Sequence, residues 1–234
     1  MILSELVQRS PIRIFERSIH GGLKAGEIGV IASQNGLGKT SVLVQLALDK
    51  LLQGKKVIHV SFTQHTHYVL AWYEDIFDEF ISRKNLENTD DVKNELVKNR
   101  VLMNFNQDGM SKDQILKSLR AMIVDGGFKA DAIIVDGFDF SRADYGSISN
   151  VKAFAKELGL SVWYSCSIGD QGRQLDEHNF PLALTDCAEL IDVVIVLEPK
   201  QDHIELSVSK DRDTPDTKAL AMRLDPRTML ILEG

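Results

Sequence analysis

Short apolar runs alternate with longer helical patterns along most of this 234-residue chain. The runs of strand length lie at residues 27–33, 56–62, 100–106, 131–137 and 160–166, and the helical patterns at about 39–52, 68–83, 111–124 and 147–158. This alternation predicts crossover units and a mostly parallel central sheet flanked by helices. Valine and isoleucine are nearly continuous within the runs, so we expect both faces of the sheet to be buried.

The pattern changes at about residue 190, where apolar runs follow one another with short turns and no room for helices. They predict antiparallel strands, so we expect C-terminal β-hairpins over residues 190–234. Residues 1–22 form an N-terminal lead-in, and no repeat or linker divides the chain. We therefore expect a single α/β domain over residues 1–234. The polar stretch 82–100 carries charges of mixed sign and predicts a solvated helix and loop.

The clearest candidate chemistry lies where the first apolar run meets the first helical pattern. Residues 30–52 read VIASQNGLGKTSVLVQLALDKLL, which predicts a strand, a loop with two glycines and an apolar helix. This is the context of a phosphate-binding loop, in which backbone amides at the positive end of a helix point at phosphate oxygens. The residues that would bind the nucleotide are Ser33, Gln34, Asn35, Gly36, Leu37, Gly38, Lys39, Thr40 and Ser41.

Two side chains of this loop carry specific roles in that interpretation. Lys39 would contact the β- and γ-phosphates of ATP, and the Thr40 hydroxyl would bind Mg²⁺. The pattern G-x-x-x-x-G-K-[ST] begins with glycine, and this chain has Ser33 at that position. The plain alternative is a turn before a helix with Lys39 solvated. A lysine in a first helical turn opposes the helix dipole, which favours the presence of an anion.

A carboxylate for the magnesium side of the site follows a later apolar run. Residues 130–140 read ADAIIVDGFDF, and a strand that ends at Asp136 would hold this carboxylate beside the loop, reaching the ion through water. Asp139 is a second candidate. The plain alternative is that Asp136 is a turn residue, since apolar runs that end in aspartate are common.

Together these segments resemble the RecA-like P-loop ATPases, within the branch of KaiC-like proteins and DnaB-type helicases. The resemblance runs from about residue 16 to the end and rests on FERSIHGGLKAGEIGVIA, SQNGLGKT, QGKKVIHVSF, IIVD and the C-terminal runs. It implies a RecA-like fold, ATP and magnesium as cofactors, and self-association. The family carries a Lys-x-Arg pair in its C-terminal hairpins, where this chain has Lys210 and Arg212.

That pair is implied by the resemblance to act in trans on the γ-phosphate of a neighbouring subunit. Sites shared in this way require a head-to-tail ring or filament. The resemblance implies a hexamer. The alternative is a lysine and an arginine on an exposed strand end. After the second strand the family has a glutamate that activates water, whereas this chain has Thr63 and Gln64. Neither is a base at neutral pH, although a glutamine can orient water.

Ser167 stands where the family often has a longer polar side chain that senses phosphate, so we expect ATP binding with weak or absent hydrolysis. His65 and His67 could share a strand face, but no residue with ligand spacing accompanies them, which favours solvated histidines over a metal site. Trp72 and Tyr73 have apolar neighbours at helical spacing, which favours packing over base stacking.

Composition narrows the classes of function. No apolar stretch has the length of a membrane helix, and the charged N-terminus argues against export. Two cysteines, Cys166 and Cys187, provide no disulfide framework, so we expect a reducing cytoplasm. Three hypotheses remain: a slow ATPase in a ring or filament, an ATP-dependent switch acting on an unidentified protein partner, and a nucleic-acid motor. A net charge of −7 and acidic loops after Asp136 and Ser167 disfavour the motor.

Overall fold

A computed structural model of the chain describes residues 10–63, 65–84, 89–106, 112–169, 174–214 and 218–233. In this part of the chain nine strands form one sheet, in the order β3-β2-β4-β5-β1-β6-β7-β8-β9. The strands are β1 (Ile28–Ser33), β2 (Val57–Ser61), β3 (Arg100–Asn104), β4 (Ala132–Asp136), β5 (Ser161–Ser167), β6 (Val193–Pro199), β7 (Ile204–Asp211), β8 (Lys218–Leu224) and β9 (Ile231–Glu233).

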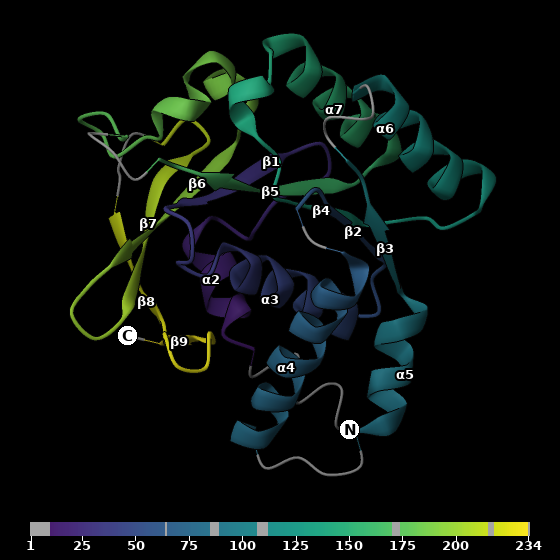
Figure 1. The fold of residues 1–234 in the computed structure, drawn as a ribbon, viewed down its shortest axis with the longest axis horizontal. Coiled ribbons are helices and arrows are strands. Elements are labelled where there is room, and N and C mark those ends of the chain that lie inside the picture. The colour runs from purple at the N-terminus through teal and green to yellow at the C-terminus, as the bar shows by residue number, and fades with distance from the viewer. Residues whose placement is uncertain are drawn as a thin grey trace.

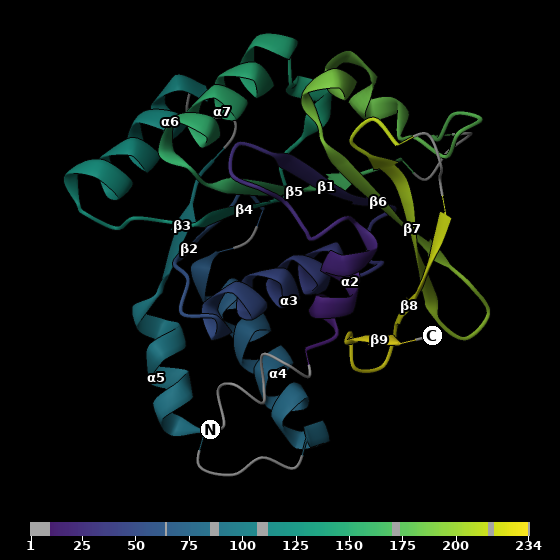
Figure 2. The same cartoon turned by 180° about the vertical axis from the view of Figure 1, so that it is seen from behind.

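Helices cover both faces of this sheet. They are α2 (Ile12–Ser18), α3 (Lys39–Leu52), α4 (Thr66–Lys84), α5 (Asp90–Lys98), α6 (Lys112–Arg120) and α7 (Tyr145–Leu158). Figure 1 shows α6 and α7 on one side of the sheet and α2, α3 and α4 on the other, and Figure 2 shows the same layers from behind. The predicted α/β architecture, with a mostly parallel sheet between helices, is therefore confirmed.

The predicted burial of both sheet faces is confirmed in the central strands. Every residue of β1, β2 and β4 is buried, whereas β3 at the edge of the sheet is only partly covered. Strands β1 to β5 pair in parallel, so all of their carboxyl ends lie along one edge of the sheet. Loops that follow these strands are thereby brought together at that edge.

The prediction of antiparallel strands throughout the C-terminal region is wrong for its first strand. β6 pairs in parallel with β1, and only β7, β8 and β9 are antiparallel to their neighbours. The physical reason is the length of the connection after β5, which includes 3₁₀ turns over Leu182–Leu190 that the sequence pattern did not predict. A connection of this length crosses back to the starting edge of the sheet, as parallel pairing requires.

The C-terminal strands curve around α2 and α3 instead of continuing a flat sheet, so that β8 and β9 lie beside these helices (Figures 1 and 2). One core cluster accordingly combines side chains of α2, α3 and α4 with apolar residues of β7, β8 and β9, including Leu206, Leu224 and Ile231. A second cluster fills the space between the other face of the sheet and α6 and α7. The curvature places the C-terminal hairpin against the start of α3.

Two helical segments differ from their predictions. The pattern over 82–100 predicts a solvated helix and loop, but α5 buries Val92 and Leu96, so this helix has a packed side. Helix α2 was not predicted as a helix. In contrast, α3 begins at Lys39 as predicted, and α7 begins on a capping box formed by Asp144 and Ser147. Such a cap satisfies amides that the first helical turn leaves unpaired.

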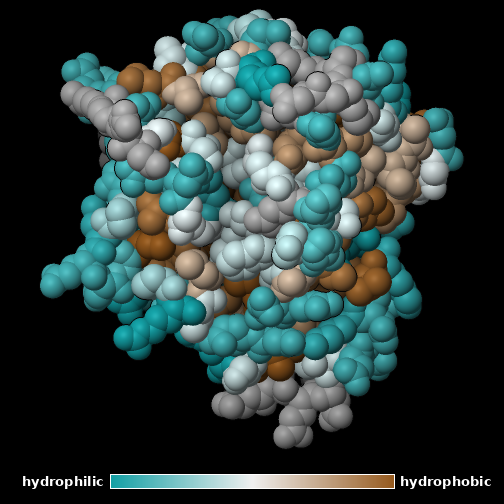
Figure 3. Space-filling model, viewed as in Figure 1, coloured by the Kyte–Doolittle hydropathy of each residue, from teal (hydrophilic) through white to brown (hydrophobic). Residues whose placement is uncertain are grey.

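The surface is predominantly hydrophilic on the face drawn in Figure 3, where apolar side chains occur in small separate groups. Scattered apolar residues of this kind are normal for a protein surface. Within the described ranges, none of the helices combines the length and the apolar character that crossing a bilayer demands.

Candidate functional site

The predicted phosphate loop connects the end of β1 to the start of α3. Gly36 and Gly38 have positive φ angles of 80° and 89°, a backbone region that glycine adopts far more readily than other residues. Gly38 is the cap residue from which α3 begins. The loop therefore ends at the positive pole of a helix of 14 residues, where unpaired amides can hold an anion.

The two glycines differ in their surroundings, which allows a matched prediction. A Cβ atom at Gly38 would lie 2.4 Å from Cδ2 of the buried Leu224, whereas nothing lies within 4 Å of one at Gly36. Gly36→Ala should therefore cost only backbone strain, and Gly38→Ala the same strain plus overpacking worth about 1–3 kcal/mol. Urea unfolding of both variants measures the difference. Equal stabilities would contradict this packing of β8 on the loop.

Lys39 folds back over the loop that precedes it. Its ammonium donates to the backbone oxygens of Gln34 at 2.9 Å and of Ser33 at 3.1 Å, and the residue is only 9% exposed. The alternative of a solvated first-turn lysine is therefore wrong. A buried ammonium requires strong hydrogen-bond acceptors, and these carbonyls supply them at the mouth of the loop.

Thr40 and Asp136 meet although 96 residues separate them in the sequence. The Thr40 hydroxyl donates to Oδ2 of Asp136 at 2.7 Å, and the Ser165 hydroxyl donates to Oδ1 at 2.7 Å. Ser165 Oγ in turn accepts from the backbone amide of Gly137 at 2.8 Å. Asp136 is 3% exposed, so both carboxylate oxygens are held in fixed positions. A hydroxyl and a carboxylate are the hard oxygen donors that Mg²⁺ prefers.

The buried surroundings of Asp136 include a histidine that sequence reasoning missed. His59 on β2 is 1% exposed, and its Nδ1 lies 3.1 Å from the Tyr73 hydroxyl. Burial lowers the pKa of His59 to about 4, although the charge of Asp136 opposes this shift, so the ring is neutral at neutral pH. Tyr73 is fully packed, which confirms its predicted packing role, and Trp72 is half-buried against the same core.

The C-terminal hairpin closes on the other side of the loop. Ser41 and Gln45 both donate to the backbone oxygen of Met229, the latter at 2.9 Å, and the Ile231 amide donates to Oε1 of Gln45 at 2.8 Å. Gln45 is 7% exposed and was not singled out from the sequence. The sequence does contain a signal for this role, namely a glutamine on an otherwise apolar helix face. A buried amide needs hydrogen-bond partners, so such a residue indicates a specific contact.

The position of the missing glutamate lies beside the Asp136 loop. A Cβ atom at Gly137 would be 2.5 Å from the Thr63 hydroxyl, so Thr63 packs directly against the residue that follows Asp136. Gln64 lies outside the described residues. Ser167 is exposed at the end of β5, in register with Ser33. Asp139, the second candidate carboxylate, does not accept the hydrogen bond of the Thr40 hydroxyl. It accepts instead from the amide and the hydroxyl of Ser141 and so caps that turn.

His65 and His67 stack on each other at the surface, with ring centroids 5.8 Å apart. Within the described ranges no group of three or more histidine, cysteine, aspartate or glutamate residues could hold a metal ion. Cys166 and Cys187 are both buried free thiols, and burial raises the pKa of Cys166 to about 12, so this thiol is unreactive.

Lys210 and Arg212 lie at the opposite edge of the sheet from the phosphate loop. β7 ends at Asp211 beside Val193, where β6 begins, whereas the loop follows the far end of β1. At about 3.3 Å per residue, the length of β1 separates the two edges by roughly 15 Å. The fold therefore brings Lys39, Thr40 and Asp136 together and leaves the Lys-x-Arg pair remote from them in the same chain.

Both members of the pair have partners within the chain. The Arg212 guanidinium donates to Glu27 at 2.7 and 2.9 Å, to Asp211 at 2.6 Å, and to the backbone oxygen of Gly22 at 2.8 Å. Lys210 donates to the backbone oxygen of Ala188 at 2.6 Å. These contacts join β7 to the segment that leads into β1, so Arg212 has a structural role that the sequence did not predict.

No protein-family model matches the chain, and no curated protein matches it in sequence.

Proposed function

We propose that this chain is a RecA-like P-loop protein that binds ATP with Mg²⁺ on residues 33–41. The observation that carries the proposal is the hydrogen bond between Thr40 and Asp136. It is made beside the loop whose backbone the Lys39 ammonium contacts. The loop follows β1 at the carboxyl edge of the parallel strands. Both neighbours of β1 in the sheet, β5 and β6, come later in the chain. Ligands of open α/β sheets bind at such positions.

Each residue has a role that follows from its chemistry. The Lys39 ammonium would exchange the carbonyl oxygens of Ser33 and Gln34 for phosphate oxygens, which are stronger acceptors. The amides from Gly36 to Ser41 would hold the remaining phosphate charge at the helix terminus. Thr40 would hold the magnesium ion directly and Asp136 through water, while Ser165 keeps the carboxylate oriented. The bound metal ion would neutralise charge on the β- and γ-phosphates.

Hydrolysis in this proposal is weak or absent, because Thr63 supplies no carboxylate to activate water. We expect steady-state turnover far below the roughly 1–100 s⁻¹ of ordinary phosphate-transferring enzymes. Thr63→Glu places a carboxylate beside the Asp136 loop and should raise the rate, while Thr66→Glu, three residues further at an exposed position, should not. Phosphate release by the three proteins measures this. Brisk turnover by wild type would show that another residue orients the water.

We propose further that nucleotide binding drives assembly. Because Lys210 and Arg212 are remote from the loop of their own chain, they could act on phosphate only in a neighbouring subunit, in a head-to-tail ring or filament. Lys210→Ala removes one ammonium that has a single backbone partner, so it tests this with little structural change. Light scattering with Mg-ATP and Mg-ADP should show ATP-favoured oligomers that Lys210→Ala weakens. A wild type that stays monomeric with both nucleotides defeats this part of the proposal.

The proposed role is a nucleotide-dependent oligomer or switch in the cytoplasm that acts on a protein partner. Two buried free thiols suit a reducing compartment. The competing role of a nucleic-acid motor predicts turnover stimulated by DNA or RNA, and the same phosphate-release assay distinguishes the two.

A further inference from the structure

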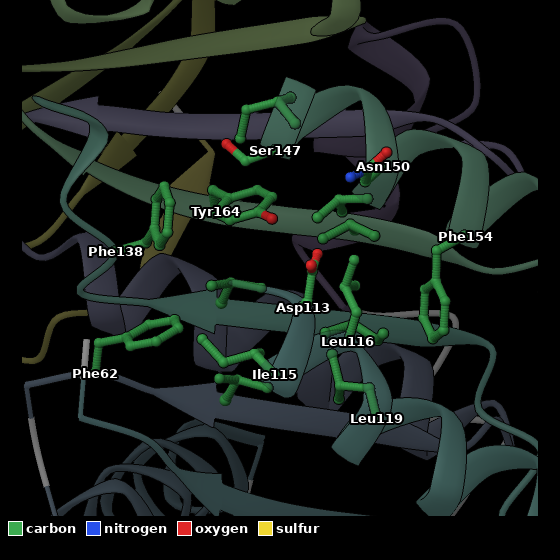
Figure 4. A pocket seen from close by; sticks show the side chains of 16 residues that line it. Phe62, Asp113, Ile115, Leu116, Leu119, Phe138, Ser147, Asn150, Phe154 and Tyr164 are labelled. Atoms are coloured by element: carbon green, nitrogen blue, oxygen red, sulfur yellow. The ribbon is translucent and has the colours of Figure 1, made fainter. Parts of the chain in front are cut away.

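Two hollows in the described part of the chain differ in size and chemistry. The one drawn in Figure 4 lies between the sheet and helices α6 and α7, has a volume of about 60 Å³ and is lined mainly by apolar side chains. The other is an open cleft of about 430 Å³ along α4, on the opposite side of the sheet (Figure 1). Of the two, the cleft along α4 has the size of a ligand site, which is roughly 300–1,000 Å³.

The cleft is formed by one face of α4 and by residues that lead into this helix. Its lining consists of Thr63, His65, Tyr68, Ala71, Trp72 and Asp75. Tyr68 is 57% exposed, and Trp72 is half-buried, with part of its side chain packed against the core. Tyrosine and tryptophan are enriched where proteins contact one another, so accessible rings around a hollow indicate an interaction surface.

The aromatic wall of the cleft is ordered by contacts between its own rings. The centroid of the His67 ring lies 4.0 Å from that of Tyr68 and 5.8 Å from that of His65, and the two histidine rings are parallel to within 11°. A wall that is already ordered loses little conformational entropy when a ligand binds.

One carboxylate of the cleft lacks a counterion. Asp75 is exposed and forms no ion pair or hydrogen bond with any residue that the structure describes. Two other acidic residues of α4 are paired, Asp78 with Lys93 and Glu79 with Arg83. Asp75 therefore places an unpaired negative charge beside the two aromatic rings of the same helix face.

This combination selects a cation as the ligand. The faces of tryptophan and tyrosine rings attract cations, and a carboxylate adds the opposite charge. A guanidinium fits better than an ammonium, because it is planar and weakly hydrated, stacks on a ring and donates two hydrogen bonds to one carboxylate. Asp75 repels the phosphates of a nucleic acid. A net charge of −7 makes a second copy of this chain a poorer source of the cation than a basic protein.

We propose that this cleft binds an arginine side chain from a basic segment of another protein, with the guanidinium between Asp75 and the rings of Tyr68 and Trp72. Thr63 in the lining packs against Gly137, which follows Asp136, so the cleft adjoins the proposed magnesium site. The inference rests on the proposed function only in giving the class of partner on which the switch acts. Arginine binding itself requires no nucleotide, so its failure would leave the nucleotide site untouched.

Blocked tripeptides Gly-Arg-Gly and Gly-citrulline-Gly are suitable probes, because citrulline keeps the shape of arginine without its charge. The protein has two tryptophans, and the indole NMR signal of Trp72 reports on the cleft while that of Trp163, which is 3% exposed, serves as a reference. Trp72→Phe identifies the first signal. Without nucleotide we expect wild type to bind the arginine peptide about tenfold more tightly than the citrulline peptide, from one cation–π contact and one exposed ion pair.

A matched pair of variants tests the role of the carboxylate. Asp75→Asn should remove most of the preference for arginine, whereas Glu74→Gln, at the neighbouring exposed position outside the lining, removes the same charge and should keep the preference. Tyr68→Ala should weaken binding of the arginine peptide about threefold by removing one ring. Equal effects of Asp75→Asn and Glu74→Gln would overturn the proposal, because they would indicate general attraction to an acidic surface.

Three results with wild type would also overturn the proposal. The first is a Trp72 signal that the arginine peptide does not shift, and the second is equal affinity for the two peptides. The third is another occupant of the cleft. A Trp72 signal that moves with protein concentration alone would assign the cleft to a second copy, and tighter binding of a single-stranded oligothymidylate than of the arginine peptide would assign it to nucleic acid.

Discussion

Lys39→Ala should weaken the binding of Mg-ATP and Mg-ADP by at least about 100-fold while the fold persists. The ammonium is the only positive side chain of the loop, and charge-assisted hydrogen bonds to phosphate are worth about 1.5–3 kcal/mol each. In the free protein Lys39 contacts two backbone oxygens, at Ser33 and Gln34. After the substitution the Ser33 carbonyl still accepts from the Ile168 amide, and Gln34 is exposed, so water can replace the ammonium at its carbonyl. Isothermal titration calorimetry measures the change.

A matched control separates a local effect from a loss of charge. Lys129→Ala removes an exposed lysine remote from the loop and should leave nucleotide affinity unchanged. Unchanged affinity in folded Lys39→Ala would show that the loop does not bind phosphate, and with it the proposed function would fall. Equal weakening by both substitutions would point to a general electrostatic effect instead.

Arg212→Ala should lower the free energy of unfolding by about 2–3 kcal/mol, a value discounted for the partial exposure of the ion pair. The guanidinium is 21% exposed and Glu27 is 17% exposed, so the substitution leaves a mostly buried carboxylate without its partner. Thermal unfolding should show a melting temperature lower by roughly 5–10 °C.

An exposed ion pair provides the control for this prediction. Arg120 and Glu157 form a bidentate pair whose side chains are 45% and 56% exposed, so Arg120→Ala should change stability little. Equal effects of the two substitutions would contradict the structural role of Arg212. A large effect at Arg212 also means that any loss of assembly in Arg212→Ala reflects folding, which is why Lys210→Ala is the better test of a shared site.

The Arg212 pair also has a pH signature. Burial would raise the pKa of Glu27, but the hydrogen bonds from Arg212 outweigh it and hold the pKa below its ordinary value. A folded-state pKa that is lowered contributes stability above the unfolded pKa and loses it as the pH falls through the folded value. The difference in stability between wild type and Arg212→Ala should therefore shrink in acid.

The local elements of this protein follow from its sequence because they depend on short-range patterns. The strand, the two-glycine loop and the helix that begins at Lys39 could all be read from residues 30–52, since glycine at positive φ and an apolar helix are local requirements. The strand that ends at Asp136 also followed, because an apolar run of that kind predicts a central strand.

Other features were decided by contacts between residues that are distant in the sequence. The direction of β6 depends on the path of the connection after β5, which a pattern of apolar residues does not determine. The contact of Thr40 with Asp136, and the support from Ser165, exist because parallel pairing aligns the ends of β4 and β5 beside α3. Arg212 was predicted to act in trans, yet only the packed structure reveals Glu27 beside it. The sequence indicates which charged side chains are candidates for a functional role. The residues that these side chains contact depend on how the whole chain packs.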